Sequence, residues 1–308
     1  MAIAATLRFG SLKEKDCMCD QANLKRWAKG ELSRREFGVM GGAAALTACT
    51  GGEASGSKGE ALAPGLVQSE VSFVTEDGTM DAIFIHPEEG EHPGVIHWPD
   101  IAGIRPAHIE MARRTAAEGF AVLLVNPYYR DVAGQIWESF ADFADGGWDT
   151  ASQYRANLSS FAVRRDARAI VGWLDAQPQL DTDRGIGAEG YCMGGPFTVY
   201  SAAEMPGRVT AAASFHGGGL VRDDEESPHK LIADTNAHYL IAIAQDDDAK
   251  APDDKTAFRE AADGAGRPAV IDVFAGDHGW TVLDSPAYAK EEAERAYAEK
   301  LKLYRTGL

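Results

Sequence analysis

The chain has 308 residues, 45% of them hydrophobic, with 47 acidic against 30 basic side chains and a formal net charge of -17 at pH 7. A surface this acidic repels nucleic-acid phosphates, so no nucleic-acid partner is expected. The length and apolar content suffice for one α/β domain with a sizeable core, preceded by an N-terminal segment of different character.

The first 49 residues resemble an export signal. Two arginines, at positions 34 and 35, precede a weakly apolar run, residues 38–48, that is too short to cross a bilayer as a stable helix. The run ends like a bacterial lipoprotein cleavage site, which would leave Cys49 lipidated. We expect residues 1–49 to be a twin-arginine signal and the protein to be periplasmic or membrane-tethered. A cytoplasmic protein with an amphipathic N-terminus is the alternative.

Residues 50–67, rich in Gly, Ser, Ala and Glu, are expected to form a flexible linker to a domain at 68–308. Either Met1 or Met18 is the start. No other Cys or His lies in the first 48 residues to complete a metal site with Cys17 and Cys19. If the signal is cleaved at Cys49, the domain keeps one thiol and forms no internal disulfide.

Strands and helices alternate through this domain. A hairpin turn at 76–78 joins the first two strands. Strands are expected at 70–75, 80–86, 93–98, 120–126, 184–189, 209–215, 239–244 and 269–274, and helices at 106–118, 162–177, 196–203, 253–262 and 286–304. This alternation predicts a mostly parallel sheet of about eight strands with helices on both faces. Residues 128–160 are too long for a simple connection and are expected to form a lid or substrate-side insertion.

Cys192 lies in a turn between a predicted strand and a predicted helix, flanked by Gly190 and Gly194. The spacing is that of the G-x-S-x-G nucleophile elbow, where small residues let the neighbouring backbone approach. A helix N-terminus also favours a thiolate, so Cys192 is a candidate nucleophile. A structural cysteine is one alternative. A dinucleotide-binding loop at 185–190 is another, but its first glycines fall inside the strand and no acidic residue follows about 20 positions on.

An activated thiol needs a base within reach and a group that orients the base. Cys192, the aspartates at 246–248 and His278 follow the chain order nucleophile, acid, histidine of α/β-hydrolases, and each comes after a predicted strand. Asp247 is the predicted acid because it lies three residues after Ala244, the small residue that ends its strand. Asp246 is the rival.

The run His216–Gly219 matches an oxyanion motif of lipases. In those enzymes the motif precedes the nucleophile in the chain, whereas here it follows. We therefore expect residues 216–219 to form a flexible loop over the edge of the sheet.

The chain resembles the dienelactone hydrolase family over roughly residues 68–305. Residues 190–195 are similar to its elbow, residues 277–280 to its histidine turn, and residues 98–103 to its segment after the third strand. The resemblance implies a monomeric α/β-hydrolase fold that opens a lactone through a thiol ester and needs neither a metal nor a cofactor.

Carried over by position, the resemblance makes Cys192 the nucleophile, His278 the general base and Asp247 the group that orients it. The backbone N–H groups of Ile101 and Met193 would form the oxyanion hole, whose donors are each worth about two to three orders of magnitude in rate.

Two positions depart from the family pattern. Asp100 stands where the family has a glutamate that helps to ionise the thiol, and aspartate is one methylene shorter. Val282 stands where members acting on dienelactone carry an arginine for the substrate carboxylate, with Arg130 and Arg155 as possible substitutes. The prediction is a hydrolase of small-molecule esters or lactones acting through an acyl-cysteine. A non-catalytic ligand-binding lipoprotein and a redox-sensing thiol protein are the alternatives.

Overall fold

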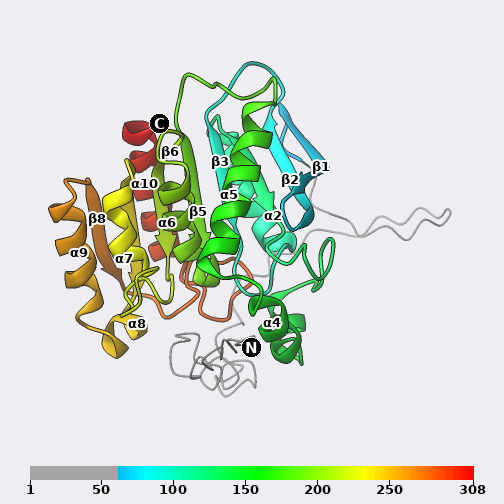
Figure 1. Ribbon diagram of the computed structural model, residues 1–308. Helices are drawn as coiled ribbons and strands as arrows, with labels where there is room; N and C mark the ends of the chain where they lie inside the picture. Colours follow the sequence, from blue (N-terminus) through cyan, green and yellow to red (C-terminus); the bar gives the residue numbers. More distant parts are fainter. Residues whose placement is uncertain (1–61) are drawn as a thin grey trace, which may run out of the picture.

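The computed structural model describes residues 62–308 (Figure 1). The predicted export signal, residues 1–49, and Cys49 lie outside the described residues. So does most of the predicted linker, 50–67, although the first strand already begins at Leu66, inside that range. In the described part of the chain, no helix is long and apolar enough to cross a membrane.

One sheet of eight strands runs through residues 62–308. The strands are β1 (Leu66–Thr75), β2 (Gly78–Pro87), β3 (Gly94–Trp98), β4 (Ala121–Val125), β5 (Ile186–Tyr191), β6 (Val209–Phe215), β7 (His238–Ala244) and β8 (Ala269–Phe274). Their order is β1-β2-β4-β3-β5-β6-β7-β8; β1, β2 and β4 pair antiparallel, and all pairs from β4 to β8 are parallel. The predicted α/β-hydrolase fold with a mostly parallel sheet is confirmed.

Helices cover both faces of the sheet, and Figure 1 shows α5 and α6 in front of it and α10 behind it. They are α2 (Pro106–Ala117), α3 (Phe140–Ala144), α4 (Trp148–Arg155), α5 (Ser160–Asp175), α6 (Gly195–Glu204), α7 (Pro228–Leu231), α8 (Gln245–Lys250), α9 (Asp254–Gly264) and α10 (Lys290–Gly307), with short 3-10 turns η1 (Cys192–Gly194) and η2 (Ile232–Asp234).

The sheet separates two apolar layers. Strand β4 is buried throughout; its Leu123 packs into the layer under α5, α6 and α9, while Val122 and Leu124 pack into the layer under α2 and α10. Successive strand side chains point to opposite faces, so a strand between two helical layers is apolar at every position.

Several boundaries differ from those predicted. The segment 128–160 contains the short helices α3 and α4, and the closing helix α10 begins at Lys290, four residues after the expected start. Turns held by backbone hydrogen bonds, such as Val282 N–H to Gly279 O, occupy the residues before α10.

The strand order β4-β3-β5 determines where on the sheet a ligand can bind. The chain moves from β3 to β4 on one side and then returns past β3 to β5 on the other, so the connections diverge between β3 and β5. In open parallel sheets, ligands bind at such a switch point, beyond the carboxyl ends of the strands. Asp100 follows β3 and Cys192 follows β5 at this point.

Candidate active site

The elbow forms as the glycine spacing predicts. Cys192 follows β5 directly, is 5% exposed, and has a φ of 51°, in the left-handed region that non-glycine residues rarely adopt. A Cβ on Gly190 would collide with the carbonyl oxygen of Gly194, and one on Gly194 would lie 2.6 Å from the carbonyl oxygen of Trp98. The bend therefore requires glycine at both positions and holds the thiol at the start of α6.

We expect Gly190→Ala to destabilise the protein by about 1 to 3 kcal/mol, the usual cost of forcing extra atoms into a packed core. Gly207→Ala is the matched control, because a Cβ there meets no atom within 4 Å. That variant should be neutral or stabilised by up to about 1 kcal/mol, since alanine restricts the unfolded chain. Urea unfolding of both variants measures the difference. Equal stability would contradict this account of the elbow.

Asp247 holds the ring of His278. The Nδ1 of His278 lies 2.6 Å from Asp247 Oδ2, and both side chains are largely buried. Burial works to raise the pKa of Asp247, but the hydrogen bond and charge of His278 outweigh it and leave the pKa below its ordinary value. Asp246 instead accepts a hydrogen bond from the backbone N–H of His278 at 2.8 Å. Both aspartates thus fix the histidine turn, and Asp247 is the one that contacts the ring.

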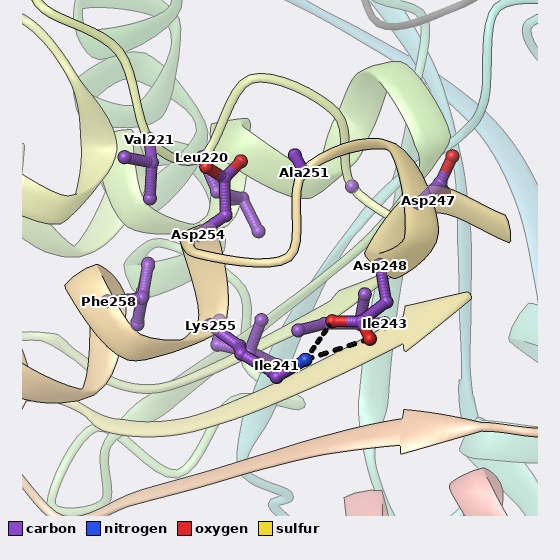
Figure 2. A pocket seen from close by; sticks show the side chains of 11 residues that line it. Leu220, Val221, Ile241, Ile243, Asp247, Asp248, Ala251, Asp254, Lys255 and Phe258 are labelled. Carbon is purple, nitrogen blue, oxygen red and sulfur yellow. Dashed lines mark hydrogen bonds and ion pairs between the residues drawn. The ribbon is translucent and has the colours of Figure 1, made fainter. Parts of the chain in front are cut away.

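Figure 2 shows the pocket behind these aspartates, on the side of α9. There Asp248 turns toward Lys255, with oxygens 2.6 and 2.8 Å from its Nζ, whereas Asp247 turns away from that ion pair. Consecutive residues of a helix point about 100° apart, and all three aspartates lie in the first turn of α8. Asp246 and Asp247 therefore hold the backbone and the ring of His278, and Asp248 binds Lys255.

His216 has a role that the sequence analysis missed. It was expected to begin a flexible loop, but it is 1% exposed and has a φ of 40°. Its Nδ1 accepts a hydrogen bond from the backbone N–H of Cys192 at 3.2 Å, its Nε2 lies 2.9 Å from Thr281 Oγ1, and its ring packs edge-on against His278. Burial holds the pKa of His216 well below its ordinary value. The neutral ring of His216 therefore connects the elbow at Cys192 with the turn that carries His278.

Asp100 reaches the Cys192 pocket but is bound by Arg105. The Arg105 guanidinium contacts both oxygens of Asp100, at 2.7 and 2.8 Å, and both oxygens of Asp284, each at 2.9 Å. Burial opposes ionisation of Asp100, yet Arg105 and His108 hold its pKa well below the usual range. Asp100 is therefore a carboxylate already paired with a cation. The role predicted for Asp100, to help ionise the thiol of Cys192, stays a prediction.

A buried chain of polar groups continues from Asp100 along the face of the sheet that α2 and α10 cover. The Nε2 of His108 lies 3.3 Å from the backbone N–H of Asp100, and its Nδ1 lies 2.9 Å from His97 Nε2. The Nδ1 of His97 lies 2.7 Å from Glu189 Oε1, and Glu189 Oε2 lies 2.7 Å from Lys300 Nζ. These residues come from α2, β3, β5 and α10, so the polar chain links two helices on one face of the sheet through β3 and β5.

The charge of Glu189 decides where the protons of this chain lie. Burial works to raise the pKa of Glu189, but Lys300 and His97 lower it to about 2, so its oxygens only accept. His97 must then donate from Nδ1 and accept at Nε2, and His108 must donate from Nδ1 and accept the Asp100 N–H at Nε2. Burial lowers the pKa of His108 to about 4, so its ring is neutral at pH 7.

This neutral His108 predicts a pH dependence of stability. Between pH 6.5, its ordinary pKa, and pH 4, the unfolded state binds a proton that the folded state does not, so the free energy of unfolding falls as the pH falls. The loss is complete below about pH 4. His108→Gln keeps a donor and an acceptor but cannot titrate, so it should reduce the slope by up to about 1.4 kcal/mol per pH unit. Urea unfolding across this range tests it, and an unchanged slope would mean that the folded ring is charged.

The hydroxyl of Tyr128 contacts both residues of the predicted oxyanion hole. Its hydroxyl donates to Ile101 O at 2.8 Å and lies 3.4 Å from Met193 Sδ. Ile101 lines the same pocket as Cys192, and Met193 is the next residue after Cys192. The geometry brings both residues to the thiol, and their role as donors to an oxyanion remains a prediction.

Cys192 and His278 line one small pocket, which we call the Cys192 pocket. Asp100, Ile101, Phe140 and Val282 also line it, and its free volume is about 20 Å³, room for about one water molecule. Val282 is fully buried, and no Arg or Lys is among the described residues lining this pocket.

Neither Arg130 nor Arg155, the suggested substitutes for the family arginine, lines the Cys192 pocket. Arg130 instead binds Asp166 and Asp77, at 2.8 and 2.6 Å. Within residues 62–308, no cluster of three or more His, Cys, Asp or Glu side chains could hold a metal ion.

Known proteins share this sequence pattern and fold. The model of the dienelactone hydrolase family matches residues 80–308. Carboxymethylenebutenolidase from Pseudomonas sp. (strain P51) is 28% identical over 170 residues, 52% of this chain and 66% of that protein. Carboxymethylenebutenolidase from Rhodococcus opacus is 25% identical over 136 residues, 44% of this chain and 48% of that protein. The matches therefore span about half to two thirds of these relatives' own lengths.

Solved structures share the fold at lower identity. A dienelactone hydrolase-like promiscuous phosphotriesterase from metagenomic libraries superposes with a TM-score of 0.64 at 21% identity, covering 79% of this chain and 98% of that one. At this identity the likeness concerns the fold alone.

Proposed function

Because the chain belongs to the dienelactone hydrolase family, we propose that it hydrolyses carboxylic esters or lactones of small molecules through an acyl-cysteine on Cys192. One observation carries the proposal. Cys192 sits in a glycine-flanked elbow with positive φ, and it shares a pocket with a histidine whose other ring nitrogen is 2.6 Å from a buried carboxylate. This is the arrangement by which a base activates a nucleophile and an acid orients the base.

The reaction uses these groups in order. His278 takes the thiol proton as Sγ of Cys192 attacks the carbonyl carbon, and the Nδ1–H to Asp247 bond keeps the accepting Nε2 in place. The carbonyl oxygen becomes an oxyanion, which the backbone N–H groups of Ile101 and Met193 stabilise. His278 returns the proton to the leaving alkoxide. Water, deprotonated by the same ring, then releases the acid and restores the thiol.

The Cys192 pocket favours an uncharged acyl group. Val282 presents an apolar side chain there, and the charge of Asp100 is neutralised by Arg105. A substrate carboxylate next to Val282 would lose water without gaining a cation, which is unfavourable. We infer that neutral aryl or alkyl esters and lactones react faster than substrates with a carboxylate beside the scissile bond.

Acetyl transfer to Cys192 tests the mechanism. The protein is mixed with p-nitrophenyl acetate, quenched in acid after milliseconds to seconds, and its intact mass is measured. We expect a transient gain of one acetyl group that maps to the peptide containing Cys192, a burst of nitrophenolate, and then return to the starting mass. Steady hydrolysis without this adduct would contradict the acyl-cysteine. A thiol that reacts with peroxide but never acylates would favour a redox sensor, and one that does neither would favour a ligand-binding protein.

We also propose that residues 1–49 direct export and that Cys49 carries the lipid. The support is the sequence pattern alone, namely paired arginines followed by a short apolar run ending in cysteine. Expression of the full chain in a bacterium with a twin-arginine pathway, followed by fractionation and intact mass, tests this. The proposal expects a membrane-bound product that begins with a lipidated Cys49, and it is contradicted by a soluble cytoplasmic product of full length.

A further inference from the structure

A cavity larger than the Cys192 pocket lies on the face of the sheet covered by α2 and α10, next to the segment 281–288. We call it the α2–α10 cavity, and its volume is about 270 Å³. We propose that it binds a second small molecule, neutral and mostly apolar, of about the size of one ring and bearing one oxygen that hydrogen-bonds to Tyr191. The inference concerns binding and does not depend on the reaction at Cys192.

The size and walls of the cavity define the class of ligand. Met111 and Ala293 line it from α2 and α10, and Phe215 and Tyr191 line it from the sheet. Dry apolar cavities of about 150 Å³ already accept benzene. The α2–α10 cavity, with a volume of about 270 Å³, therefore has room for a substituted ring. Leu283, at 41% exposure, lies where the cavity reaches the surface.

The charged side chains around the cavity already have partners. The guanidinium of Arg114 binds Glu294, and the ammonium of Lys300 lies 2.7 Å from Glu189. Glu110, which also lines the cavity, faces Arg113 at 3.6 Å. A charged ligand would have to disrupt the buried pair of Lys300 and Glu189, which is costly, or lie beside exposed groups that already neutralise each other. The occupant is neutral.

One polar group inside the cavity lacks a partner. Tyr191 is 3% exposed and stacks between Phe215 and His97, and its hydroxyl makes no hydrogen bond to any group in residues 62–308. Burial raises the pKa of Tyr191 well above its ordinary value, so the group stays a neutral O–H that donates as well as accepts. The hydroxyl opens onto the cavity, where the oxygen of a ligand can hydrogen-bond to it.

Binding of p-cresol tests the proposal, with toluene as a probe of the same shape that lacks the hydroxyl and p-toluate as one that adds a charge. Titration calorimetry on the full chain measures affinity. Spectra of protein labelled with ¹³C in the methionine methyls locate the site, because Met111 lines the cavity whereas Met193 adjoins Cys192. We expect p-cresol to bind more tightly than toluene, p-toluate not to bind, and the Met111 methyl to shift.

Tyr191→Phe isolates the predicted hydrogen bond. It should weaken p-cresol about two- to tenfold, the usual worth of one neutral hydrogen bond, and leave toluene unchanged. Tyr200→Phe is the matched control, since Tyr200 is also buried but its hydroxyl faces Arg222 and the carbonyl oxygen of Glu226. That variant should bind both probes as the wild type does.

Two further results decide the location. Ala293→Leu fills the cavity and should abolish binding of both probes, while alkylation of Cys192 with iodoacetamide should leave binding intact. Loss of binding on alkylation, or a shift of Met193 alone, would place the ligand in the Cys192 pocket and overturn the proposal. Failure of all three probes to bind at millimolar concentration would show a cavity filled only by water, and would also overturn it.

Discussion

Replacing Cys192 by alanine is expected to lower kcat/KM for p-nitrophenyl acetate by about four to six orders of magnitude, the loss seen when a covalent nucleophile is removed. The sulfur is the atom that forms the acyl bond, and no neighbouring group of the Cys192 pocket replaces it in the proposed mechanism. His278 would retain its bond to Asp247, so the residual rate reports what the base and backbone donors achieve alone. Stopped-flow and steady-state rates measure the effect.

Cys192→Ser and the unfolding free energy are the controls for this variant. Serine keeps a nucleophile of higher pKa in the same elbow, so its rate should fall between those of wild type and alanine. Alanine at φ 51° has the same backbone strain as cysteine, so stability should change little. A Cys192→Ala protein that is folded and turns over the ester at the wild-type rate would refute the acyl-cysteine mechanism.

Asp247→Asn is expected to lower kcat by about four orders of magnitude. An asparagine side chain can present its N–H to the ring, which places the proton on the wrong nitrogen of His278 and removes the charge that stabilises the imidazolium. The wild-type contact of 2.6 Å to Nδ1 is the structural reason for expecting so large an effect. The pH–rate profile distinguishes this from simple unfolding, because the ring should also lose a proton more easily without its carboxylate.

Asp246→Asn is the matched control, one residue away in the same first turn of α8. Its wild-type contact is with the backbone N–H of His278, which an amide oxygen can still accept. We expect a loss of about tenfold or less from this neutral replacement. If Asp246→Asn were the more damaging variant, the orienting role would belong to Asp246.

The alternation of strands and helices was predictable because each element is long enough to show its period. Strand β4 is apolar at all five positions, and α5 repeats Val163, Ala167, Ile170, Val171 and Leu174 on one face. The helices α3 and α4 were missed because five to eight residues give too few turns for a period to emerge.

The nucleophile elbow was predictable from its glycine spacing. The choice of Asp247 as the acid was predictable only in part. Gly190 is required by the carbonyl of Gly194, four residues on, whereas Gly194 is required by the backbone after β3, so the G-x-C-x-G spacing identified the turn without showing every contact behind it. Separating Asp247 from Asp246 depends on where α8 begins, because one residue changes the direction of a helical side chain by about 100°. The expected strand end at Ala244 chose correctly between the two for contact with the ring.

The second partner of Arg105 and the contact of His216 with Thr281 could not be predicted, since they come from distant parts of the chain. Asp284, which completes the Arg105 clamp, is 179 residues from Arg105, and Thr281 is 65 residues from His216. No local pattern encodes such contacts. A histidine at the end of a parallel strand and directly before glycines was the one available signal, because that edge of the sheet gathers functional side chains.

The hydrogen bond from the Phe140 N–H to Asp284, 2.8 Å long, ties a residue that lines the Cys192 pocket to the carboxylate that binds Arg105. The Cys192 pocket has room for about one water molecule, so an ester needs its lining, Phe140 included, to move before the carbonyl reaches the sulfur. The kcat/KM of highly activated esters, which does not include deacylation, should therefore converge on one ceiling set by how often Phe140 moves away and independent of the alcohol that departs.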